Sequence, residues 1–129
     1  MERVIEERLR ERRRGIEAAR RFAECVKRLL GRVAVVVFGS YARGDFNEWS
    51  DVDVLVATER GLPRSPLERL GILEECLREA PIVEPIVLTL GEFRRLLSKR
   101  NPLALEAVER GLVLVDEVGF ARLLRRGLD

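Results

Sequence analysis

One stretch, residues 35–56, constrains the fold more than any other part of the chain. It begins with an apolar β-branched run, turns polar at Gly39-Ser40, and returns to an apolar run that opens with Asp51-Val-Asp53. Short runs of this kind, bounded by glycine and polar residues, are typical of buried strands. The sequence therefore predicts two strands with a polar connection between them.

The two aspartates at the start of the second run indicate a cation site. Side chains alternate across a strand, so Asp51 and Asp53 point to one side while Val52 and Val54 point into the core. Two neighbouring carboxylates repel each other unless a positive charge lies between them. Mg²⁺ is commonly held by one or two carboxylates together with substrate phosphates, which makes it the expected ion.

The polar residues after the first run suit a phosphate group. Gly39 has no Cβ, so the backbone can turn sharply and its N–H groups can approach an anion closely. Ser40 adds a hydroxyl donor, and Arg43 can place a guanidinium fork against phosphate oxygens. We expect Gly39, Ser40 and Arg43 to form a phosphate cradle that faces the metal site.

Together these residues resemble the signature of the polymerase-beta-type nucleotidyltransferase superfamily, and within it the minimal nucleotidyltransferases of prokaryotes. The resemblance rests on Gly39-Ser40, on Ala42-Arg43-Gly44, and on Ser50-Asp51-Val-Asp53 at their spacing. It implies a nucleotidyltransferase fold that takes ATP or another nucleoside triphosphate and uses Mg²⁺, with two ions possible.

Glu84 is the candidate for a third carboxylate. It is an acid inside the apolar run 82–88, and Pro85 beside it has no N–H for a sheet ladder, which indicates a bulge or an outward-facing edge position. In the family that the chain resembles, a third acid comes from such a strand and binds metal with the first two. The alternative is an exposed edge glutamate without a role in the site.

The rest of the chain predicts alternating helices and strands. Apolar spacing favours helices over 1–30, 65–80, 89–100, 101–111 and 116–126, and strands at 82–88 and 113–115. The expected fold is α/β (α+β): a small mixed sheet of three to four strands, with helices packed mainly on one face. At 129 residues we expect one nucleotidyltransferase domain over 1–129.

Composition narrows the chemistry and the environment. The chain has no histidine, so proton transfer falls to a carboxylate or to metal-bound water. Both Cys25 and Cys76 lie among apolar residues of predicted helices, and buried thiols are favoured over a disulfide. Abundant charge with no glutamine suggests a thermophilic source. No apolar run is long enough for a membrane span and the first residues are charged, which favours a cytoplasmic protein.

Two local features have a structural and a functional interpretation. The arginines at positions 10 and 12–14 could bind phosphate or RNA, but a solvated helix turn paired with glutamates is favoured, and direct nucleic-acid binding is not expected at a net charge of only +2. Phe46 and Trp49 could cover a nucleobase, although packing against the body is favoured.

The resemblance also implies a function. It predicts transfer of a nucleoside monophosphate, AMP from ATP, to a hydroxyl of a partner protein, with a small helical HEPN-type toxin as partner and this chain as its antitoxin. Catalytic and metal roles fall on Asp51, Asp53 and Glu84. Two alternatives remain open: a non-catalytic module that neutralises its partner by contact, and a small-molecule adenylyltransferase completed by another subunit.

Overall fold

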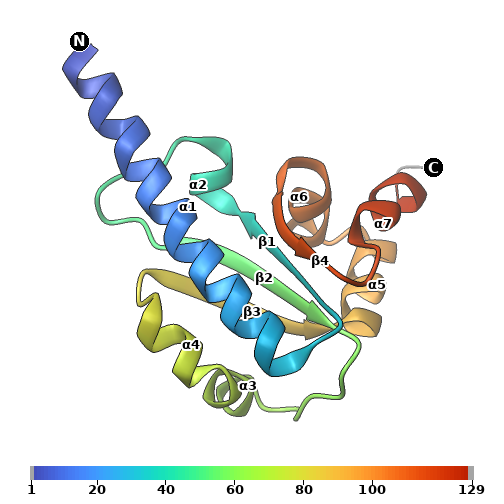
Figure 1. Ribbon diagram of the computed structural model, residues 1–129. Helices are drawn as coiled ribbons and strands as arrows, with labels where there is room; N and C mark the ends of the chain where they lie inside the picture. Colours follow the sequence, from blue (N-terminus) through green and yellow to red (C-terminus); the bar gives the residue numbers. More distant parts are fainter. Residues whose placement is uncertain (1, 128–129) are drawn as a thin grey trace.

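The computed structural model, which describes residues 2–127, is built on a four-stranded mixed sheet (Figure 1). The strand order is β3-β2-β1-β4, with bounds β1 Val33–Phe38, β2 Val52–Thr58, β3 Val83–Thr89 and β4 Leu112–Asp116. Strand β1 is antiparallel to β2 and β4, whereas β2 and β3 run parallel. The predicted mixed α/β fold is confirmed, and strands form in each of the four places where the apolar runs predicted them.

One face of the sheet is covered by the long helix α1 (Glu2–Leu30) and the short helices α3 (Pro66–Ile72) and α4 (Glu74–Glu79), as Figure 1 shows. The side chains of Val33, Val35 and Val37 pack with Phe22 and Val26 of α1 on this face. In the part of the chain that the structure describes, no helix has both the length and the hydrophobicity needed to cross a bilayer.

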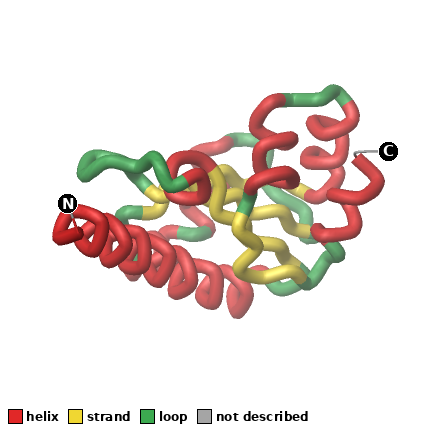
Figure 2. The backbone as a smooth tube through the Cα atoms, turned by 90° about the horizontal axis from the view of Figure 1, so that it is seen from above, coloured by secondary structure: helices red, strands yellow, loops and turns green. Residues whose placement is uncertain are grey.

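The other face is covered as well, by α5 (Leu90–Ser98), α6 (Pro102–Arg110) and α7 (Phe120–Gly127), so helices are not confined mainly to one face as expected (Figure 2). Here Val36 and Phe38 pack with Phe93 and Phe120. All six residues of β1 are buried, because this central strand carries apolar side chains on both sides. A strand that is apolar on both sides is typical of a sheet that is covered on both faces.

The predicted helix over 65–80 is divided into α3 and α4 at Leu73, which has φ −97° and ψ 9°. Leu73 is fully buried, and Gly71 just before it weakens the helix locally. Ser65 caps α3 by accepting a hydrogen bond from the backbone of Glu68. The capping box predicted at Thr89 and Glu92 is present in full at the start of α5.

The prediction that Cys25 and Cys76 are free thiols is wrong: they form a disulfide between α1 and α4. The two helices lie side by side on one face of the sheet, which brings the two Cα atoms within 5.5 Å of each other. The residues are 51 positions apart in sequence, so no local pattern indicated that they meet.

Candidate functional site

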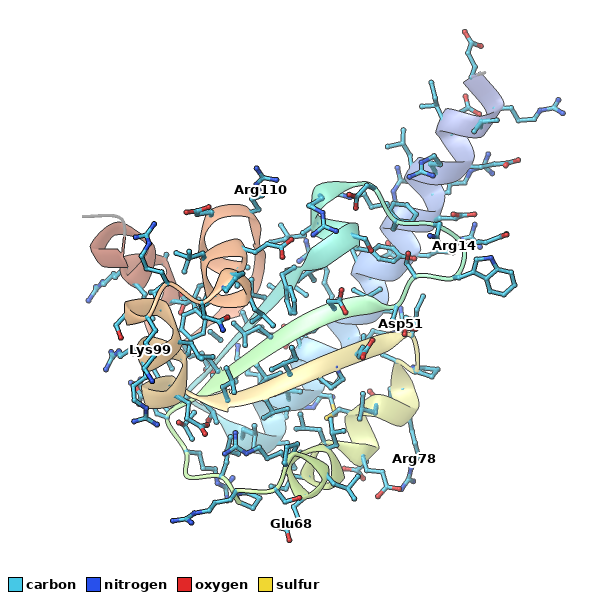
Figure 3. The ribbon with its side chains drawn as sticks, turned by 180° about the vertical axis from the view of Figure 1, so that it is seen from behind. Arg14, Asp51, Glu68, Arg78, Lys99 and Arg110 are labelled. Carbon is cyan, nitrogen blue, oxygen red and sulfur yellow. A yellow bond between two sulfur atoms is a disulfide. The ribbon has the colours of Figure 1, made fainter. Side chains whose placement is uncertain are left out.

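The candidate site lies where β1 ends and where β2 and β3 begin, on the sheet face that α6 covers. The short helix α2 (Gly39–Arg43) follows β1 directly, and the connection 44–51 leads back to β2. Figure 3 shows Asp51 at this end of the sheet. The site residues predicted from the sequence therefore come from four adjacent segments: α2, the connection, β2 and β3.

Gly39 is required by the contact that it makes with Asp53. Its φ is +72°, a conformation that residues with a Cβ rarely adopt. A Cβ built on Gly39 would also overlap the Oδ2 atom of Asp53. The glycine thus lets the backbone pass directly beside the carboxylate, and Ser40, half-buried, follows at the next position of α2.

The structure brings Asp53 and Glu84 to neighbouring positions. They are paired in the parallel register of β2 and β3, and residues paired in this way point to the same side of the sheet. Strand β3 is an edge strand, which explains how the sheet tolerates Pro85 without a bulge. Glu84 itself is exposed. It therefore combines the two features that the sequence analysis treated as alternatives, an edge position and a place beside Asp53.

Asp51 lies one residue before β2 begins and is exposed, so the sheet ladder does not hold it. Its charge nevertheless reaches Asp53. The pKa of the half-buried Asp53 is raised, first by burial and then by the negative charges of Glu84, Asp51 and Glu106. Arg43 acts in the opposite direction and lowers that pKa. Asp53 is thus surrounded by acidic groups, and the positive charge of Arg43 balances their negative charge only in part.

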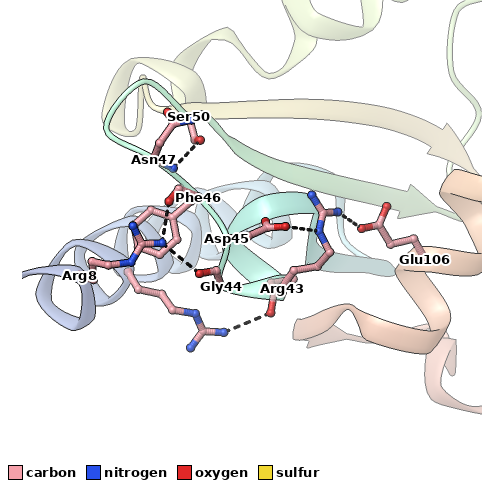
Figure 4. A network of polar contacts seen from close by, with 10 residues as sticks. Arg8, Arg43, Gly44, Asp45, Phe46, Asn47, Ser50 and Glu106 are labelled. Atoms are coloured by element: carbon pink, nitrogen blue, oxygen red, sulfur yellow. Dashed lines mark hydrogen bonds and ion pairs between the residues drawn. The ribbon is translucent and has the colours of Figure 1, made fainter. Parts of the chain in front are cut away.

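Arg43 is held by two carboxylates. Its Nε donates to Asp45 Oδ2 at 3.2 Å, and its Nη1 donates to Glu106 Oε1 (Figure 4). These hydrogen bonds raise the pKa of the guanidinium above its usual value. In this arrangement Arg43 lies beside the acidic group, with two of its five N–H donors taken.

Glu106 is the residue that the sequence analysis missed. It lies on α6, between the buried residues Ala104 and Ala107, and joins the site only because α6 packs against the sheet next to α2. An acid at a half-buried position of an amphipathic helix was the one available signal. Such positions are common, so the signal could not be separated from an ordinary surface glutamate.

The connection 44–51 is fixed by α1. Phe46 stacks on Tyr41 with ring centroids 4.3 Å apart, and the Arg8 guanidinium lies 4.9 Å from the Phe46 ring. Arg8 also donates to the carbonyl oxygens of Gly44 and Phe46 (Figure 4). Arg12 donates to the carbonyl oxygen of Tyr41. Arg12, one of the clustered arginines, therefore holds α2 instead of pairing with a glutamate as expected.

The two aromatic residues of this connection have different environments. Phe46 is buried, as the favoured interpretation predicted. Trp49 is 86% exposed, so its predicted packing against the body is wrong. The reason is local: Asn47 and Ser50 hydrogen-bond across the turn, and Asn47 Oδ1 accepts from the Trp49 N–H, which turns this side chain outward.

The acidic residues fit a divalent cation that substrate phosphates help to hold. Within residues 2–127, no three acidic or thiol side chains converge into a ready-made metal site. The donors are all carboxylate oxygens, the ligands that Mg²⁺ prefers, and burial followed by their mutual repulsion raises the pKa of Asp53. Ions bound by few protein ligands and several phosphate oxygens are usual in nucleotide enzymes.

Comparison with known proteins identifies the family of the chain. The family described as "Nucleotidyltransferase domain" matches residues 19–111. A curated relative, "Putative protein adenylyltransferase MJ1305" of Methanocaldococcus jannaschii, is 36% identical over 75 residues, which are 50% of this chain and 50% of the relative. The chain thus spans about half the length of that relative.

Two solved structures share the fold. A "putative nucleotidyltransferase" from Sulfolobus solfataricus superposes with a TM-score of 0.60 at 24% identity, over 82% of this chain and 84% of the other. A toxin-antitoxin structure with AMP-PNP superposes with a TM-score of 0.58 at 14% identity, over 84% of this chain and 82% of the other. The residues matched by the family include the strands β1, β2 and β3 and the helices α2 and α6. The chain belongs to the nucleotidyltransferase domain family.

Proposed function

We propose that the chain is a Mg²⁺-dependent adenylyltransferase that transfers AMP from ATP to a hydroxyl of a partner protein. The observation that supports it most is the pairing of Asp53 with Glu84 in register, with Gly39 directly against Asp53. This arrangement places an acidic group next to a backbone turn with no Cβ in the way. A nucleoside triphosphate with its divalent cation has the complementary chemistry.

Each residue has a proposed role. Asp51, Asp53 and Glu84 would hold Mg²⁺, which supplies positive charge to the phosphates and lowers the pKa of the acceptor hydroxyl. Gly39 lets the backbone approach the phosphates, Ser40 donates its hydroxyl, and Arg43 donates N–H groups to the outer phosphate oxygens. All of these residues act through position and charge.

The transfer itself forms one bond and breaks one. The acceptor oxygen attacks the α-phosphorus, and the bond from that phosphorus to the bridging oxygen of the β-phosphate breaks, so that pyrophosphate leaves. The hydroxyl proton passes to a carboxylate of the site, because the chain has no histidine to take it.

The partner is proposed from the relatives and from the family resemblance. One relative is named as a protein adenylyltransferase, and one structural neighbour is a toxin-antitoxin complex. We propose a small helical HEPN-type toxin as acceptor, with this chain as the antitoxin that neutralises it. The adjacent gene is the first candidate for this partner.

Labelled ATP tests the proposal. The chain is incubated with α-labelled ATP and Mg²⁺, with and without the product of the adjacent gene, and the label is followed on denaturing gels. We expect the label on the partner protein, dependent on Mg²⁺ and absent with the Asp51→Asn/Asp53→Asn variant. Efficient transfer by the isolated chain to an aminoglycoside or to RNA would show that the proposed acceptor is wrong.

Ligand binding tests the phosphate assignments separately. Ser40→Ala and Arg43→Ala should weaken ATP binding more than AMP binding in calorimetry, because both residues are assigned to the outer phosphates. Wild-type protein should bind ATP more weakly in chelator than with Mg²⁺, because the carboxylates repel a bare polyphosphate. Equal weakening of ATP and AMP would remove Ser40 and Arg43 from the proposed cradle.

A second function, nucleotide-dependent neutralisation by contact without transfer, is favoured by one observation. In the described part of the chain the acidic side chains do not converge into a metal site of three or more ligands. A binding module would bind ATP and its partner without moving the label. The labelled-ATP experiment separates the two functions directly.

A further inference from the structure

The two carboxylates that hold Arg43 are themselves fixed in different ways (Figure 4). Asp45 follows Arg43 by two residues in the connection 44–51, and its side chain is 62% exposed. Glu106 lies 63 positions away on α6, and its side chain is only 28% exposed. The contact with Asp45 is thus local and open to solvent, whereas the contact with Glu106 depends on how α6 packs against the site.

Helix α6 is fixed at both of its ends. At its start, the side chain of Asn101 caps the helix by accepting from two backbone N–H groups. At its end, Gly111 lies so close to β1 that a Cβ in its place would overlap the side chain of Val36. The position of Glu106 relative to the sheet is therefore set by the packing of the whole helix.

The guanidinium of Arg43 has one edge that suits a phosphate group. The N–H of Nε and one N–H of Nη2 are parallel, and together they match two phosphate oxygens. Asp45 accepts from Nε and so occupies half of this edge, whereas Glu106 accepts from Nη1. A phosphate that binds both donors of the edge must take the place of Asp45, but it leaves the contact with Glu106 intact.

We propose that Glu106 is a positioning residue for Arg43, and that Asp45 occupies the phosphate-binding edge of this arginine until a nucleoside triphosphate displaces it. This role rests on the function proposed above, in which Arg43 binds the outer phosphates. Glu106 stays on Nη1 in both states and keeps the long side chain of Arg43 from turning to solvent. The exposed pair with Asp45 is weak and is readily replaced by a bidentate contact with a more highly charged group.

Calorimetry of ATP and AMP binding with Mg²⁺ tests the opposite effects of the two carboxylates. Asp45→Asn should tighten ATP binding about threefold, because an exposed competing charge is lost. Glu106→Ala should weaken ATP binding about tenfold, because Arg43 must then be ordered by the ligand, and it should change AMP binding little. Glu106→Gln should lie between wild type and Glu106→Ala, since its amide oxygen still accepts from Nη1.

A control and a double variant separate positioning from charge and from folding. Glu109→Ala removes the same charge from an exposed place on α6 and should leave both affinities unchanged. In an Arg43→Ala background, Glu106→Ala should no longer weaken ATP binding, because no guanidinium is left to position. Circular dichroism should show the same helix content in every variant.

The outcomes that overturn the proposal differ from those that overturn the function. If Arg43→Ala weakens ATP binding but Glu106→Ala tightens it, Glu106 acts only by repelling the phosphates. Equal weakening of ATP and AMP, or weakening that persists in the Arg43→Ala background, would also overturn the positioning role. If Arg43→Ala leaves ATP binding unchanged, the phosphate assignment of Arg43 is wrong, and the positioning role of Glu106 is wrong with it. Because binding is measured, the result does not depend on whether AMP is transferred.

Discussion

Arg43 and Arg69 both come from short helices, both pair with a glutamate from a later helix, and yet they have opposite surroundings. Arg69 is 9% exposed and donates to the carbonyl oxygens of Pro63 and Val87 and to both carboxylate oxygens of Glu92. Arg43 is exposed, and its two carboxylate partners come from α6 and the site connection.

The two centres also lie at opposite ends of the parallel strand pair. The Arg69 centre lies where β3 ends at Thr89 and α5 begins, and there Arg69 makes four hydrogen bonds while Glu92 also accepts from the Thr89 backbone. The Arg43 centre lies where β2 and β3 begin, among carboxylates that repel one another. A buried pair with several hydrogen bonds is costly to break, whereas an exposed pair exchanges its partners easily. The first therefore serves the stability of the fold, and the second is suited to taking a ligand.

The sharpest test of this contrast removes the acidic pair. Asp51→Asn/Asp53→Asn should reduce transfer by roughly three orders of magnitude or more, because the proposed cation site is lost. Steady-state transfer with the partner protein measures this loss.

The stability of Asp53→Asn alone is the control for that experiment. The folded-state pKa of Asp53 is raised, so its ionised form disfavours the fold at neutral pH, and the asparagine variant should melt at a higher temperature. The gain should vanish below about pH 4, where wild-type Asp53 is protonated in both states. A lower melting temperature at neutral pH would contradict this electrostatic account of the site.

Arg69→Ala should show the opposite behaviour. Removing it leaves the Glu92 carboxylate and the Val87 carbonyl without their partner, and we expect a loss of about 3–5 kcal/mol in the free energy of unfolding. Urea denaturation measures it, and Arg43→Ala is the matched control, with an expected loss below about 1 kcal/mol because its ion pairs are exposed. Equal losses in the two variants would remove the distinction between the centres.

Glu84→Gln tests whether the site end of β3 contributes to the chemistry. As a third carboxylate acting mainly in the transition state, its loss should slow transfer by roughly two orders of magnitude and leave nucleotide affinity within a few-fold. Single-turnover kinetics and calorimetry measure the two quantities. The exposed Glu109 on α6 provides a control, and Glu109→Gln should change neither. Unaltered turnover in Glu84→Gln would show that Glu84 is an exposed edge glutamate without a role in transfer.

Acid should weaken the Arg69 centre in a defined range. Hydrogen bonds from Arg69, followed by that from the Thr89 backbone, lower the pKa of Glu92 from 4.5 to about 2. Because the folded-state pKa is depressed, this stabilisation is complete above pH 4.5 and is lost as the pH falls toward 2. We expect about 2 kcal/mol of stability to depend on it, visible when wild type and Glu92→Gln are compared by urea denaturation at pH 6 and pH 3. If the difference in stability between wild type and Glu92→Gln is the same at both pH values, the contribution of Glu92 comes from packing and not from its charge.

The sequence by itself determined the parts of this protein that depend on neighbours along the chain. Short apolar runs located the four strands, Thr89 and Glu92 determined the start of α5, and Gly39 with Asp51 and Asp53 marked the end of the sheet that was predicted to hold the site. These signals are local, because a strand or a cap is decided by residues a few positions apart. The single domain over 1–129 and the roles of the site residues remain predictions.

Tertiary structure decided whatever depends on residues that are distant in sequence. The disulfide joins cysteines 51 positions apart, and Glu106 meets Arg43 across 63 positions. The second helical layer follows from the burial of β1 on both faces, which its apolar run allowed but could not by itself require. Each of these contacts forms because helices pack on the sheet at particular positions, and the packing of whole elements is not encoded in any one segment.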